Sequence, residues 1–200
     1  MTATDYTYLA LLADRSGSMI KIRDDAEGGL KTLIKDQREL PGKLTVNLFQ
    51  FDDAFDEIPE AEIDGWGLTP RGSTAMLDAI GKSMTLVGER LSKMPEDERP
   101  DKVVFAIITD GLENASCEWR HDQVAKLIAQ QQTDYGWQVV FTAANMDAAT
   151  VGKGLGIRPE SAMNFEANPL NTRSAYAAMS AGVSSYRKGL TDFAEVPDHA

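Results

Sequence analysis

Oxygen-bearing side chains gather in three short segments of the chain. The first segment places Asp14, Ser16 and Ser18 at alternate positions around a glycine. The second ends a Gly-Ser-Thr sequence with Thr74, and the third contains Asp110 within Thr-Asp-Gly. Together they offer two carboxylates and three neutral hydroxyls, with no nitrogen or sulfur ligand. Hard oxygen donors of this kind suit Mg²⁺, with Mn²⁺ or Ca²⁺ as alternatives, and they disfavour zinc.

Two of these segments directly follow apolar runs that predict buried parallel strands. Residues 6–13 and 103–109 are almost unbroken apolar sequence, which is typical of strands covered on both faces. Asp14 follows the first run and Asp110 follows the second. Because the carboxyl ends of parallel strands meet at one edge of a sheet, where such sheets bind ligands, we expect all three segments to lie together.

The remaining pattern alternates strands with helices and predicts an α/β fold. We expect a doubly wound, mostly parallel central sheet with one antiparallel edge strand and helices on both faces. Further strands are expected at 44–51, 55–63 (the antiparallel edge), 137–143 and 162–165. Helices are expected at about 22–34, 77–94, 119–132 and 148–155, followed by a last helix capped by Asn171.

Length and composition limit the domain organisation and the class of partner. The 200 residues show no repeat or linker, so we expect a single domain over residues 1–190 and a polar, frayed C-terminal tail over 191–200. The net charge of −11 repels phosphate backbones and anionic lipid, which argues against nucleic-acid and membrane partners. We find no signal peptide and no membrane-spanning run, and a single cysteine excludes an internal disulfide. The expected location is the cytoplasm.

Two of the three segments, taken alone, also have an ordinary explanation. Ser16 and Ser18 are common helix-capping residues, and Asp110 could simply open a turn at a strand end. Arg15 and Arg71 flank the candidate ligands and could steer a partner's carboxylate, but we expect them to be solvated surface residues.

Three further polar residues lie near the candidate ligands in the sequence. Glu113 and Asn114 follow the third segment and could contact bound water or a partner, although an ordinary surface role is favoured slightly. Asp78 comes one helical turn after the second segment, and we expect it to be a charge on the face of a helix.

The three segments in this order resemble the von Willebrand factor A (vWA) family, and residues 109–116 also resemble its stand-alone bacterial and phage members. The resemblance extends over about residues 6–188. It implies a Rossmann-like fold with a metal-ion-dependent adhesion site (MIDAS). By this resemblance Ser16, Ser18 and Thr74 would bind the cation, while Asp14 and Asp110 would balance its charge, often through water. One coordination position would stay open for a carboxylate of a partner protein.

The resemblance implies a metal-dependent protein–protein interaction module that is not an enzyme. Its partner would present an acidic residue, and the resemblance leaves open an AAA+ ATPase or a stress-response assembly. One alternative is a metal-dependent phosphohydrolase of the haloacid dehalogenase type, but that chemistry needs an aspartate as general acid where Ser16 stands. Another is a structural scaffold or adaptor whose metal site is silent.

Overall fold

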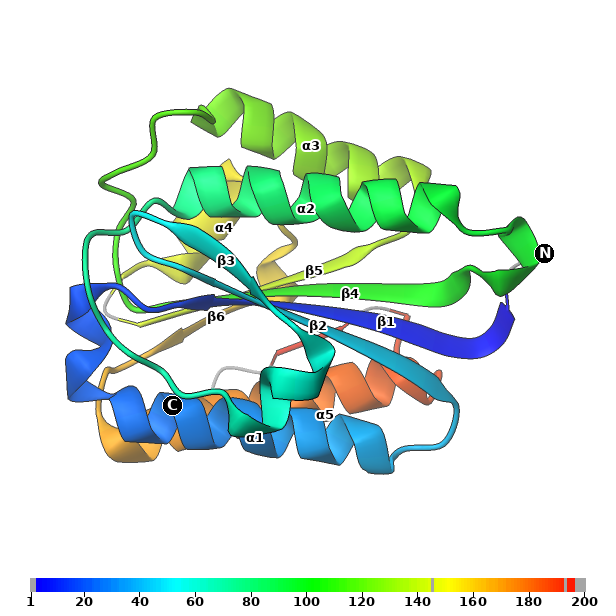
Figure 1. Cartoon of the computed structure of the whole chain (residues 1–200), viewed down its shortest axis with the longest axis horizontal. Helices are drawn as coiled ribbons and strands as arrows, with labels where there is room; N and C mark the ends of the chain where they lie inside the picture. Colours follow the sequence, from blue (N-terminus) through cyan, green and yellow to red (C-terminus); the bar gives the residue numbers. More distant parts are fainter. Residues whose placement is uncertain (1–2, 145, 193, 197–200) are drawn as a thin grey trace.

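A six-stranded sheet forms the centre of the molecule, and helices pack on both of its faces (Figure 1). The computed structural model describes residues 3–144, 146–192 and 194–196. The strands are β1 (Ala3–Asp14), β2 (Lys43–Phe51), β3 (Phe55–Ile58), β4 (Pro100–Thr109), β5 (Gln138–Ala144) and β6 (Ala162–Phe165). The α-helices are α1 (Arg23–Glu39), α2 (Met76–Lys93), α3 (His121–Asp134), α4 (Ala148–Gly154) and α5 (Pro169–Arg187). Short 3₁₀ helices are η1 (Gly17–Lys21), η2 (Glu60–Gly65), η3 (Glu96–Glu98) and η4 (Pro159–Ser161).

The order and direction of the strands confirm the predicted fold class. The sheet runs β3-β2-β1-β4-β5-β6, and every neighbouring pair is parallel except β2 and β3. Helices α1 and α5 cover one face, while α2, α3 and α4 cover the other (Figure 1). Each face has its own apolar core, because alternate side chains of the buried strands point to opposite sides.

The middle of the sheet contains the point where the strand order reverses. From β1 the chain first moves to β2 on one side and later returns to β4 on the other side. Ala13 of β1 pairs with Ile108 of β4, so the two strands end next to each other. Asp14 and Asp110 therefore stand at neighbouring carboxyl ends, which is where doubly wound sheets bind ligands.

Three local predictions are corrected by the structure. The edge strand ends at Ile58 and not at residue 63, because Pro59 has no N–H group to continue the ladder and η2 follows it. The last helix is capped by Asn168, whose side chain accepts the backbone N–H of Asn171 at 2.9 Å. The third helix begins at His121, two residues later than expected.

Part of the expected frayed tail is packed against the domain. Ala194 and Val196 are buried, and the Val196 N–H donates to the carbonyl of Glu160 at 2.9 Å. Apolar side chains at these two positions explain the packing. Residues 193 and 197–200 of the expected tail lie outside the described residues. Over the described part of the chain, no helix is both long enough and apolar enough to cross a bilayer.

Candidate metal centre

Asp14 joins the ends of the two central strands. It is fully buried, and its Oδ1 accepts the backbone N–H of Ser16 at 2.6 Å. Its Oδ2 accepts a hydrogen bond from the hydroxyl of Thr109, the last residue of β4, at 2.5 Å. Sequence reasoning did not identify Thr109 as part of the site, although it is the polar residue that directly follows the apolar run 103–108.

The other four predicted ligands lie around Gly111. Ser16 Oγ is 3.0 Å from Ser18 Oγ, and Ser18 Oγ donates to Asp110 Oδ1 at 2.5 Å. A methyl group on Gly111 would lie 2.9 Å from Thr74 Oγ1, 3.4 Å from Ser18 Oγ and 3.6 Å from Ser16 Oγ. The three hydroxyls therefore converge on one small space, and the structure brings all five predicted residues together.

The hydroxyl of Thr74 is available as a ligand. Thr74 is only 3% exposed, yet its hydroxyl makes no hydrogen bond to any described residue. It does not cap α2, because that helix begins at Met76 and its N-cap position is Ala75. Among the described residues, the buried side-chain atoms that lack a partner are Thr142 Oγ1, Thr172 Oγ1 and Arg187 Nε, so the Thr74 oxygen is not sealed in the interior and is open to a ligand.

Burial raises the pKa of both carboxyl groups above the ordinary value of aspartate. Burial is the main reason that the pKa of Asp14 rises to about 6, and the negative charge of Asp110 adds to the rise. Burial also raises the pKa of Asp110, against opposing effects of the Ser18 hydrogen bond and the Lys21 charge. A bound cation would favour both ionised forms. With three hydroxyls that converge on one space, this donor set fits a hard divalent ion.

Tyr176 of α5 is a neighbour of the site that the sequence did not indicate. Its pKa is raised mainly by burial, and also by the charges of Asp14 and Asp110. Its ring packs directly on α1, since a methyl group on Gly29 would lie 2.6 Å from the Tyr176 Cγ. The last helix therefore contacts the first helix close to the candidate centre.

Asp52, at the end of β2, holds two of the ligand-bearing loops together. Its Oδ2 accepts Arg15 Nε at 3.0 Å and Arg71 Nε at 2.6 Å, and its Oδ1 accepts the N–H of Ala54 at 2.6 Å. Burial raises the pKa of Asp52, but these bonds outweigh that effect and hold it below the ordinary value. The expectation that Arg15 is a solvated surface residue is wrong: it is 6% exposed and also pairs with Asp56.

The loop that follows Asp110 is fastened to the start of α2. Asn114 Oδ1 accepts the N–H of Thr74 at 2.9 Å, and the Asn114 N–H donates to the Thr74 carbonyl at 3.0 Å. Glu113 accepts the N–H of Leu77 at 2.8 Å and the N–H of Ser116 at 2.7 Å. Glu113 and Asn114 therefore fix the position of Thr74 relative to Asp110. This is a structural role in the site and not the role of an ordinary surface residue.

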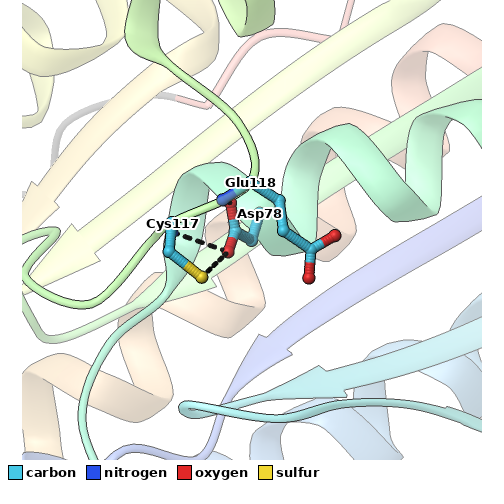
Figure 2. Close-up of side chains that lie close together, drawn as sticks. All are labelled: Asp78, Cys117 and Glu118. Carbon is cyan, nitrogen blue, oxygen red and sulfur yellow. Dashed lines mark hydrogen bonds between the residues drawn. The ribbon is translucent and has the colours of Figure 1, made fainter.

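Asp78 is a second fastening point of the same loop and not merely a charge on the helix face. Its two carboxylate oxygens accept the N–H groups of Cys117, Glu118 and Trp119 at 2.7–2.9 Å. Potential metal-binding atoms of Asp78, Cys117 and Glu118 lie within 4.8 Å of one another (Figure 2). However, the Asp78 oxygens already accept backbone N–H groups, and Glu118 pairs with Lys82 at 2.7 Å. The geometry fits a loop anchor, separate from the five predicted ligands.

Comparison with known proteins supports the resemblance through structure and not through sequence. No protein-family model matches the chain, and no match is found among curated proteins. Von Willebrand factor type A from Catenulispora acidiphila superposes with a TM-score of 0.62 at 14% identity, covering 89% of this chain and 42% of that one. The vWF domain of the type V pili tip protein Mfa5 from Porphyromonas gingivalis superposes with a TM-score of 0.65 at 10% identity, covering 91% of this chain and 96% of that one.

A third similar structure is proximal thread matrix protein 1 from the mussel byssus, described with a zinc-occupied MIDAS motif. It gives a TM-score of 0.57 at 15% identity, covering 94% of this chain and 45% of that one. The chain thus spans less than half the length of the mussel and Catenulispora proteins. At these identities the comparison concerns the fold, and it agrees with the strand order and helix layers described above. The chain therefore has the fold of von Willebrand factor A domains.

Proposed function

We propose that this protein is a metal-dependent protein-binding module. The observation that carries the proposal is the convergence of three hydroxyls, from Ser16, Ser18 and Thr74, beside two buried carboxylates. In this proposal the hydroxyls hold a divalent cation, and Asp14 and Asp110 balance its charge. A cation held mainly by neutral oxygens keeps its attraction for anions, so it favours a further carboxylate supplied by a partner.

The choice of metal rests on the chemistry of the donors. Five oxygen donors favour Mg²⁺, with Mn²⁺ or Ca²⁺ as alternatives. The mussel protein is described with zinc in its MIDAS motif, which supports a divalent ion at such a site without fixing which one. Mg²⁺ is our proposal for this chain.

The proposed partner is a protein that presents an acidic residue, and neither nucleic acid nor membrane is expected to bind. An AAA+ ATPase or a stress-response assembly would be suitable settings, and the cytoplasm is the proposed location. We propose that the module is not an enzyme. A haloacid dehalogenase type of reaction is not favoured, because the hydroxyl of Ser16 is a poor general acid near neutral pH.

Removing one hydroxyl tests whether the site works or is silent. Thr74→Ala deletes a ligand that makes no hydrogen bond to the described residues, so the fold should survive. The variant should bind Mg²⁺ more weakly and lose the partners that wild type captures from host lysate in Mg²⁺ but not in EDTA. Thr133→Ala, on the exposed face of α3, is the control and should behave as wild type. If folded Thr74→Ala retains the same EDTA-sensitive partners in the same yield, the site is not used for recognition.

A further inference from the structure

Two large apolar side chains are exposed on the loops that supply the candidate ligands. Ile20 is 61% exposed and Leu112 is 62% exposed. Ile20 comes two residues after Ser18, and Leu112 comes two residues after Asp110. Among the described residues, only three other large apolar side chains are exposed to this degree: Tyr135, Leu170 and Leu190. Apolar side chains that form a large exposed patch commonly mark a surface that a partner covers.

Both residues lie close to a candidate ligand along the chain. Consecutive Cα atoms are about 3.8 Å apart, so each Cα lies within about 7.6 Å of the Cα of the neighbouring ligand. The hydrogen bond between Ser18 and Asp110 joins the two loops. Ile20 lies in η1, which is held by the buried Met19. Leu112 directly precedes Glu113, which is bonded to the start of α2.

Positive charge near the same loops complements an acidic partner, although the chain as a whole carries −11. Lys21 directly follows Ile20 and is an exposed residue at the end of η1. The Arg71 side chain is 58% exposed and contacts Asp52 through Nε. Lys21 therefore places a positive charge directly beside the aliphatic Ile20, while the Arg71 charge is paired with Asp52.

We propose that Ile20 and Leu112 form the apolar part of the recognition surface. The partner is then a protein segment whose metal-bound Asp or Glu is flanked by aliphatic side chains. This inference rests on the proposed function, since it requires the cation to bind a carboxylate. Aliphatic contacts around that carboxylate exclude water, and contacts of this kind surround the strongest positions of many protein interfaces.

Synthetic peptides of defined sequence test this preference. Each peptide has a central Asp or Glu flanked by either Leu and Ile or Ser and Thr, and peptides with a central Asn or Gln are blanks. Binding to the full chain is measured on dense arrays in Mg²⁺ and in EDTA. Wild type should bind the aliphatic-flanked acidic peptides about tenfold more tightly than the Ser/Thr-flanked ones, and only in Mg²⁺.

Variants separate this inference from the proposed function. Ile20→Ser with Leu112→Ser should remove the preference for aliphatic flanks while metal-dependent binding of acidic peptides persists. Leu190→Ser is the matched control: Leu190 is 73% exposed and follows the C-terminal end of α5. The carbonyl of Arg187 there accepts Lys102 Nζ near the start of β4, whereas Asp110 follows the other end of that strand. Metal-dependent binding without any preference for aliphatic flanks would overturn the inference alone. A complete lack of metal-dependent binding would overturn the proposed function, and the inference with it.

Discussion

Gly111→Ala places a methyl group in the space where the three hydroxyls converge. The new carbon would lie 2.9 Å from Thr74 Oγ1 and within 3.6 Å of both serine hydroxyls. Gly111 does not have a left-handed backbone conformation, so alanine is compatible with its φ angle. The main effect is therefore steric, and it falls on the candidate centre.

The expected sizes of the two effects differ enough to be measured separately. Crowding of the hydroxyls should lower the free energy of unfolding by about 1–3 kcal/mol, which a domain with a typical stability of roughly 5–15 kcal/mol tolerates. Mg²⁺ needs oxygen ligands at about 2.0–2.1 Å, and a methyl group between the hydroxyls prevents this. At a free Mg²⁺ concentration tenfold above the wild-type Kd, the free energy of unfolding of wild type should rise by about 1.4 kcal/mol, which corresponds to an increase of roughly 3–6 °C in Tm. Gly111→Ala should gain almost nothing.

Thermal unfolding with and without Mg²⁺ measures this difference. Gly28→Ala in α1 is the matched control, because no atom lies within 4 Å of the added methyl group. It should have a slightly higher Tm in both conditions, since alanine favours the helix, and it should keep the full Mg²⁺-induced increase. If folded Gly111→Ala shows the same Mg²⁺-induced increase as wild type, the cation does not sit among these hydroxyls.

Three further predictions concern pH, loop anchoring and catalysis. The pKa of Asp14 is raised from 3.8 to about 6, so in the metal-free protein its contribution to stability is fully present below pH 3.8 and is lost as the pH rises through about 6. Mg²⁺ requires the ionised carboxylate, so it should raise the Tm more at pH 7.5 than at pH 5; an equal rise at both would contradict this role of Asp14. Asp78→Ala removes the acceptor of three loop N–H groups and should lower the urea-unfolding free energy by about 2–3 kcal/mol, whereas exposed Asp134→Ala should change it little. A decrease in unfolding free energy below about 0.5 kcal/mol would mean that Asp78 is not needed to hold the loop in place. The purified protein should not hydrolyse p-nitrophenyl phosphate in Mg²⁺, and turnover that disappears in Asp14→Asn would refute the non-enzymatic proposal.

The arrangement of the candidate ligands could be predicted because each lies beside a strong local signal. The apolar runs before Asp14 and Asp110 define two buried strands, and parallel strands bring their carboxyl ends to one edge. The helical periodicity after Thr74 places that residue just before α2. These local patterns were sufficient to predict that the three segments meet.

The groups that hold the segments in place could not be predicted in the same way. Arg15 contacts Asp52, which is 37 residues away, and Asp78 accepts N–H groups from residues 39 to 41 positions later. No local periodicity indicates such pairs, so Arg15 and Asp78 were expected to be exposed surface charges. The burial of Ala194 and Val196 likewise depends on contacts with residues 160 and 161, far away in the sequence.

Anomalous scattering from crystals grown with Mn²⁺ tests the central claim most directly, because it locates the ion without any assumption about its ligands. We predict one strong peak within coordination distance of the Ser16, Ser18 and Thr74 hydroxyls, with Asp14 and Asp110 beside it. The same crystals report on the Asp78, Cys117 and Glu118 cluster, where we predict no peak. Crystals that contain Mn²⁺ only at that cluster, or that show no peak near the three hydroxyls, would contradict the account.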